Sequence, residues 1–185
     1  GSLVSIGDIV HRGNFKSKSK HLNKLMRVTP GEPLSLSKVY KGIRRLRNMS
    51  VLSSVSYTIP AINDSSFDTL DIVLTHEESK PFVFEGRVGF DTRELFNTRF
   101  SLENRNFFGK SKHLKLSGWY SSVEFGADVT YMDPSLFYTD LRFTARLYGL
   151  SEELLDANRV NMTIIGNSYQ LTNNIKNNAL VLGAL

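Results

Sequence analysis

The 185-residue chain contains no cysteine. This absence excludes a disulfide framework, a thiolate nucleophile and a zinc site built from cysteine. No run approaches about 18 apolar residues either, which excludes a transmembrane helix. A membrane protein is still possible, because the strands of a membrane barrel alternate polar and apolar side chains and escape hydropathy averages. The mean hydropathy of -0.21 therefore does not decide the question.

Residues that could carry catalysis or bind a metal are few and badly placed for either role. Glu77 and Glu78 are adjacent, and neighbours in a strand point to opposite faces, so these two carboxyl groups do not share a proton. The histidines lack metal-ligand spacing, and we expect each on the surface or on a polar face: His11, His21, His76 and His113. The sequence predicts no catalytic residue, no metal site and no cofactor, and hence not an enzyme.

The positive charge is concentrated in the first part of the chain. Residues 1–80 carry 12 Lys and Arg against 7 Asp and Glu, a net charge of +5, whereas residues 81–185 carry 11 of each kind. A basic module can bind nucleic acid. Here, however, the positive residues fall mainly on two expected helix faces without interleaved aromatics. Solvated helix faces explain this pattern, so we expect no nucleic-acid partner.

The first 80 residues predict a compact module of the order β-α-α-β-β. Apolar residues recur at helical spacing in two segments and at alternate positions in three others. Ser35 or Ser37 can cap the second helix. The expected elements are a strand at Leu3–Val10, a helix at Ser17–Arg27, a helix with Leu36, Val39, Tyr40, Ile43 and Leu46 on its apolar face, a strand at Val51–Ile59 and a strand through Leu70, Ile72 and Leu74.

Lys80-Pro81 is the expected boundary, and past it strand follows strand without a long helix. In the stretch FVFEGRVGF, which begins at Phe82, apolar side chains alternate with polar ones. We expect further strands up to Leu147, a polar loop in GLSEELLDANR, and two weaker strands after it. In each expected strand the charged residues occupy the alternate positions opposite the apolar ones, and so share one face. They are Glu85, Arg87, Arg99, Glu103, Lys115, Glu124, Asp128, Asp140, Arg142 and Arg146.

Two architectures fit this alternation. Strands of about 9–11 residues that are apolar on one face and polar on the other are typical of a membrane barrel. Aromatics at the strand ends, such as Phe90 and Tyr120, fit the belts of a bilayer interface. A soluble β-sandwich joined to a small binding module also has polar outer faces, although its strands are usually shorter. The pattern favours the membrane barrel without excluding the sandwich.

The motifs of both halves, in this order, resemble the BamA/TamA superfamily of outer-membrane protein assembly factors. The stretch VHRGNFKSKSKHLNKLMRVTPGEPLSLSKVYKGIRRLRNMSVLSSVSYTI is similar to a POTRA (polypeptide-transport-associated) domain. The Gly13-Asn14 turn and Pro30-Gly31 stand where the family places them. Ser50 stands where the family usually has glycine. In the second half, RNFFGKSKHLKLSG resembles a strand entry of the family's barrel, and YMDPSLF resembles the Asp-Pro turn after its fourth strand.

The resemblance implies a POTRA domain at residues 1–80 and the N-terminal strands of an incomplete outer-membrane barrel at residues 81–185. The family's barrel has 16 antiparallel strands, whereas this chain predicts about six. Its inward-folded loop with an Arg-Gly-Phe motif has no match here. Together with the opening Gly1-Ser2 and the lack of a signal peptide, this leads us to expect an excised piece of a longer, processed protein.

The resemblance also implies a function and its partners. The protein would lie in the outer membrane, or an equivalent organelle membrane, with the POTRA domain in the periplasm. Unfolded outer-membrane or secreted polypeptides, membrane lipid, and periplasmic or lipoprotein partners would bind it. Client strands would add by β-augmentation to two edge strands. The implied edge residues are Val51, Val55, Tyr57 and Ile59 in the first half and Phe82, Phe84, Gly86, Val88 and Phe90 in the second.

Other functions fit the same motifs. A polypeptide secretion channel of the two-partner type has the same architecture, and so does the transporter part of a patatin-type autotransporter. We expect the open edges and the uncovered apolar face of an incomplete barrel to make the chain self-associate in the absence of detergent.

Overall fold

The computed structural model of the protein describes residues 4–58, 68–92, 95–154, 160–173 and 179–184. The chain divides into two compact units. Residues 1–80 and 108–111 make up the first unit, and residues 81–107 and 112–185 make up the second. Neither α-helix in the described residues is long and apolar enough to cross a bilayer.

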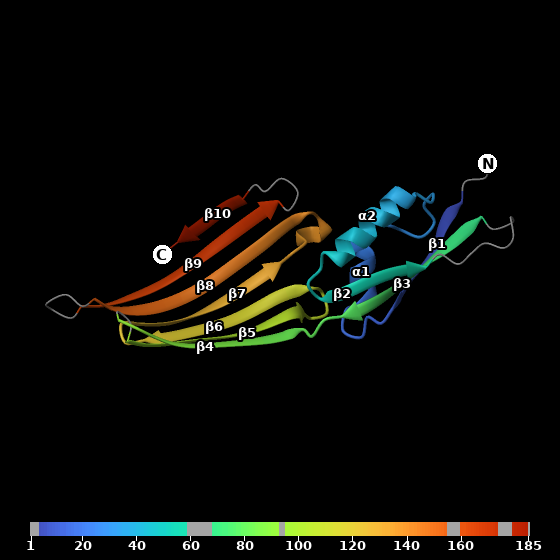
Figure 1. Ribbon diagram of the computed structural model, residues 1–185. Helices are drawn as coiled ribbons and strands as arrows, with labels where there is room; N and C mark the ends of the chain where they lie inside the picture. Colours follow the sequence, from blue (N-terminus) through green and yellow to red (C-terminus); the bar gives the residue numbers. More distant parts are fainter. Residues whose placement is uncertain (1–3, 59–67, 93–94, 155–159, 174–178, 185) are drawn as a thin grey trace. The chain divides into compact units, whose positions relative to one another are not determined.

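The first unit is a three-stranded sheet with two helices (Figure 1). β1 (Ser5–Arg12) runs parallel to the central β3 (Thr69–Glu78), and β2 (Leu52–Thr58) pairs antiparallel with the other side of β3. Between β1 and β2 the chain forms α1 (Ser19–Met26) and α2 (Leu36–Arg47). The predicted β-α-α-β-β order is confirmed.

The two helices cover the sheet with apolar faces that the sequence largely predicts. Ser35 caps α2, since its side-chain oxygen accepts a hydrogen bond from the backbone N–H of Lys38 at 3.4 Å. Leu36 and Tyr40 remain half exposed, so the apolar face of α2 is narrower than expected. The helix residues buried in the core are Leu22, Leu25 and Met26 of α1 and Val39, Gly42, Ile43 and Leu46 of α2.

A pair of histidines lies in the interior of this unit. His11 and His76 face each other across β1 and β3, with Nδ1 of His11 2.7 Å from Nε2 of His76. His76 is only 4% exposed and lies on the buried face of β3 with Ile72 and Leu74, so the expectation of a surface or polar-face position is wrong for it. Burial, with the nearby His11 as a second cause, lowers the pKa of His76 to about 4. The pair is therefore uncharged at neutral pH.

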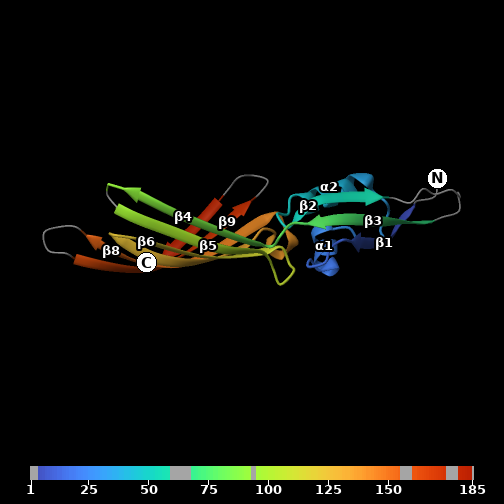
Figure 2. The same cartoon turned by 60° about the horizontal axis from the view of Figure 1, so that its bottom comes forward.

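The second unit is one antiparallel sheet in which each strand pairs with the next along the chain. Its strand order is β10-β9-β8-β7-β6-β5-β4, and Figures 1 and 2 show the strands side by side in a curled sheet. In the described residues β4 and β10 each pair on one side only. The strands are β4 (Phe82–Asp91), β5 (Leu95–Phe107), β6 (Lys112–Ser121), β7 (Glu124–Asp133), β8 (Leu141–Leu154), β9 (Val160–Asn173) and β10 (Ala179–Ala184).

Two details of this sheet differ from the expectation. Alternation of polar and apolar residues predicts strand from Phe137 on, but a 3-10 turn, η1 (Leu136–Tyr138), follows the Asp133-Pro134 step, in line with the resemblance of YMDPSLF to an Asp-Pro turn, and φ is positive at Phe137 and Tyr138. Proline donates no backbone hydrogen bond, which favours a turn there. The first part of the expected polar loop, up to Leu154, is strand instead, because β8 continues to pair with β9 there, and residues 155–159 lie outside the described residues.

Truncation of Leu46 tests the packing of α2 on the sheet. Leu46 is completely buried whereas Arg44 is exposed, so Leu46→Ala should lower the free energy of unfolding by roughly 2–5 kcal/mol and Arg44→Ala should change it little. Chemical denaturation of a segment covering residues 1–80 measures both values. Equal losses for the two variants would contradict this assignment of the helix faces.

Candidate functional site

One face of the seven-stranded sheet is an exposed apolar surface. Cross-strand partners share a face, and the register pairs Phe84 with Leu102, Leu102 with Leu116 and Leu116 with Val129, so the apolar parity continues across β4 to β7. The large side chains exposed on this apolar face are Phe82, Phe84, Val88, Phe90, Phe96, Phe100, Leu102, Leu116, Tyr120, Phe125, Val129, Leu147, Ile165, Tyr169, Leu180 and Leu182. Such an extended surface needs a covering medium or partner.

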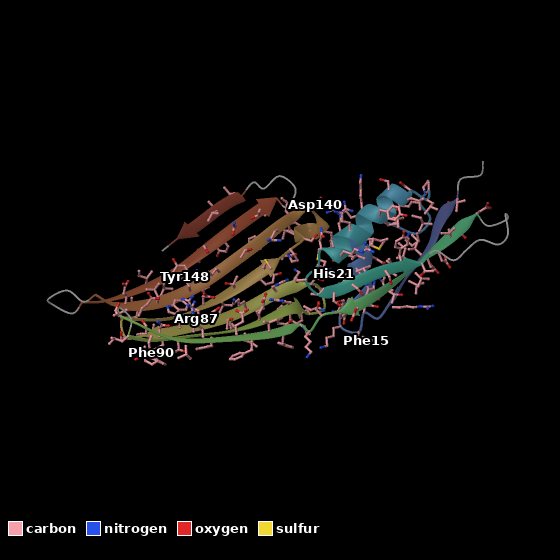
Figure 3. The ribbon with its side chains drawn as sticks, in the orientation of Figure 1. Phe15, His21, Arg87, Phe90, Asp140 and Tyr148 are labelled. Carbon is pink, nitrogen blue, oxygen red and sulfur yellow. The ribbon has the colours of Figure 1, made fainter. Side chains whose placement is uncertain are left out.

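The opposite, polar face carries the charges whose shared parity the sequence predicts. Figure 3 shows Arg87 and Phe90 on opposite sides of β4, with Tyr148 on the same side as Arg87. Asp128 of β7 accepts hydrogen bonds from the guanidinium of Arg146 on β8, the shorter one at 2.6 Å. Lys115 of β6 lies 3.8 Å from the carboxylate of Glu85. The polar face is thus organised by charge pairs between strands.

Two arginines of the polar face lie directly opposite each other. Arg87 of β4 and Arg99 of β5 are register partners. The guanidinium carbon of Arg99 lies 5.9 Å from the ring centroid of Trp119, a cation-π contact. Within the described residues no carboxylate forms an ion pair with either arginine. Both arginines line a depression in the polar face, together with Lys115, Arg146 and the carboxylates of Glu85, Glu124 and Asp128.

The first candidate edge is β4. It pairs only with β5, and no partner for the backbone groups of its other side lies among the described residues. The predicted residues Phe82, Phe84, Gly86, Val88 and Phe90 all lie in this strand and share the apolar face. Their large side chains are between 61% and 79% exposed. An edge strand with one apolar and one polar face can accept a further strand of the same pattern.

The second candidate edge is β2, which in the described residues pairs only with β3. Val51 precedes this strand and is buried, and its carbonyl accepts a hydrogen bond from Ser79 N–H, so Val51 is not an edge residue. Val55 and Tyr57 lie within β2, and the side chain of Val55 points into the core. Ile59 lies outside the described residues.

Two side chains of α2 reach this edge, and the sequence did not single them out for that role. The guanidinium of Arg47 donates to the carbonyl oxygen of Val55 through Nε at 3.0 Å and Nη2 at 2.9 Å. The hydroxyl of Tyr57 donates to that of Tyr40 at 3.0 Å, and their rings are edge to face. The only sequence signal for either contact is Tyr40 itself, a residue with a hydroxyl group on an otherwise apolar helix face.

Arginine substitutions test which face of the sheet meets lipid. In a complete protein containing this segment, Phe84→Arg or Phe143→Arg should block membrane insertion, since a cation on the lipid-facing side costs up to roughly 2–4 kcal/mol, the value at the midplane. Arg87→Phe, on the polar face, should have a milder effect. An insertion assay in which Arg87→Phe proved the more damaging would invert this assignment of the faces.

The comparisons with known proteins match this geometry. Residues 4–78 match the family model described as "POTRA: Surface antigen variable number repeat". No curated protein sequence that was compared with the chain matches it.

Solved structures match both units in their chain order. BamA from Haemophilus ducreyi lacking POTRA domains 1-3 superposes with a TM-score of 0.78 at 20% identity, over 97% of this chain and 34% of that one. CdiB from Acinetobacter baumannii superposes with a TM-score of 0.58 at 16% identity, over 92% of this chain and 33% of the CdiB chain. CdiB from Escherichia coli also superposes with a TM-score of 0.58, at 14% identity, over 92% of this chain and 32% of the CdiB chain. The chain spans about a third of the length of these structures. Residues 4–78 match the POTRA family, and the chain as a whole has the same fold as the matching third of the BamA structure, a POTRA-like unit followed by an antiparallel sheet.

Proposed function

We propose that this segment belongs to an outer-membrane factor that assembles barrel proteins or translocates polypeptides. The observation that carries the proposal is the apolar row of β4, exposed at 61% to 79%, in the first strand of a sheet that superposes on BamA with a TM-score of 0.78. Lipid offers no hydrogen bonds to the unpaired backbone groups of such a strand. A client strand that adds to β4 supplies those hydrogen bonds and extends the apolar face to the bilayer at the same time.

The two units have separate roles in this proposal. The POTRA domain lies in the periplasm and receives extended client polypeptides or periplasmic partners, lipoproteins among them, along β2. The sheet forms the first strands of a 16-stranded barrel whose apolar face contacts lipid and whose polar face lines the lumen. The function is a templating of backbone hydrogen bonds and involves no bond-breaking chemistry.

A polypeptide secretion channel is the second candidate, because the fold also matches CdiB. The TM-score is higher for BamA, at 0.78, than for CdiB, at 0.58, and this difference favours barrel assembly over secretion. The transporter part of a patatin-type autotransporter has no observation of its own in its favour. A soluble sandwich is disfavoured, because the described residues of the second unit form a single sheet.

Disulfide trapping tests the templating role. The chain has no cysteine, so a complete protein that contains this segment and lacks cysteine elsewhere can carry one at Val83 of β4 or, as the control, at Thr130 in the interior strand β7. Both side chains lie on the polar face. An outer-membrane barrel precursor with a single cysteine should form adducts with the β4 variant and not with the β7 variant. Equal adducts at both positions, or none at β4, would contradict strand addition at this edge.

A further inference from the structure

The open edge of β2 is not bare at its centre. Val55 is the fourth of the seven residues of β2, and its carbonyl oxygen accepts two N–H bonds from Arg47, at 3.0 and 2.9 Å. A backbone carbonyl has two lone pairs. The fork of one guanidinium therefore uses the acceptor capacity that a neighbouring strand would need at this position.

The position of Arg47 follows from the packing of α2. Ile43 and Leu46 are buried, which fixes the rotation of the helix about its axis. Tyr40 and Arg47 are seven residues apart, about two helical turns, and so share one side of α2. Tyr40 meets Tyr57 and Arg47 meets Val55, so this side of the helix is fastened along β2 at two points.

The contact is suited to being exchanged. Arg47 is the last residue of α2 and its side chain is exposed, so the guanidinium can swing into solvent without opening the core. A neutral carbonyl is a weaker acceptor for it than a carboxylate, which binds the guanidinium fork with two charge-assisted hydrogen bonds. A carboxylate brought to this edge would therefore draw Arg47 away from Val55.

We propose that Arg47 is a latch on the β2 edge that an extended polypeptide strand releases by presenting an acidic side chain beside Val55. The strand's backbone N–H then takes the place of the guanidinium at the Val55 carbonyl, and the carboxylate receives the guanidinium. The latch keeps β2 from pairing with arbitrary strands, as natural proteins protect exposed edges. It makes the edge selective for acidic strands. This inference rests on the proposed strand-accepting role of β2.

The experiment uses two peptides and the full chain in detergent micelles. The acidic peptide copies residues 124–133 (EFGADVTYMD), a strand of this fold with a central Asp128, and the amide peptide is the same sequence with Asp128→Asn. An environment-sensitive fluorophore on Ser56→Cys, beside Val55 and unique in a cysteine-free chain, reports binding at β2 rather than at β4. Both peptides are titrated against the chain with Arg47 intact, Arg47→Ala, and Lys41→Ala, which removes an equal charge from another side of α2.

With Arg47 intact, the acidic peptide should bind about fivefold more tightly than the amide peptide, the effect of roughly one net charge-assisted hydrogen bond at an exposed site. Arg47→Ala should bring this ratio close to one by tightening the binding of the amide peptide. Lys41→Ala should keep the ratio of the intact chain. Arg47→Lys keeps the charge and loses the fork, so it should give an intermediate ratio and serves as the second variant if Arg47→Ala does not fold.

The outcomes separate the latch from the proposed function. Binding at Ser56→Cys with the same ratio in the intact chain and in Arg47→Ala would overturn the latch and leave strand addition at β2 standing. If Lys41→Ala removed the preference for the acidic peptide as completely as Arg47→Ala, the preference would come from the overall positive charge of α2, and this result would also overturn the latch. If neither peptide binds at β2 in any variant, the latch and the β2 part of the proposed function both fail.

Discussion

The hydrogen-bonding requirement of edge strands is the constraint on which this molecule depends. Among the described residues the first sheet ends at β1 and β2 and the second at β10 and β4, and β2 and β4 are the edges proposed to accept a further strand. Water can satisfy such groups at β2, and Arg47 satisfies part of them from within the protein. At β4 the apolar row beside the edge favours lipid, where only another strand can satisfy them. The two edges therefore differ in how strongly they require a partner.

The same backbone pattern separates the two faces of the sheet. Antiparallel pairing places alternate side chains on the same face, so the register from β4 to β10, which shifts only at Asn104/Phe107, carries one apolar and one polar surface across all seven strands. A slip of one residue in any pair would move charges such as Asp128 and Arg146 to the apolar side. The hydrogen bond between Asp128 and Arg146 and the exposure of the phenylalanines of β4 on the other face thus depend on the same strand register.

The sequence predicted those features that depend on local spacing. The helix faces through Leu22 and Leu46, the cap at Ser35 and the parity of the charges all follow from periods of about 3.6 or 2 residues. Other features depend on which segments the fold brings together. The contact of His11 with His76 spans 65 residues. The bond of Arg47 to Val55 required the rotation of α2 against β2, and the length of β8 was set by its pairing with β9 rather than by its polar composition.

The central claim is that the apolar face of the sheet contacts lipid while the polar face does not. The chain has one tryptophan, Trp119, on the polar face. In vesicles that contain acyl-brominated lipid, Trp119 fluorescence should be quenched weakly, whereas a Phe84→Trp, Trp119→Phe variant should be quenched strongly. Strong quenching of Trp119, or no quenching at position 84 in chains shown to be membrane-bound, would contradict the account.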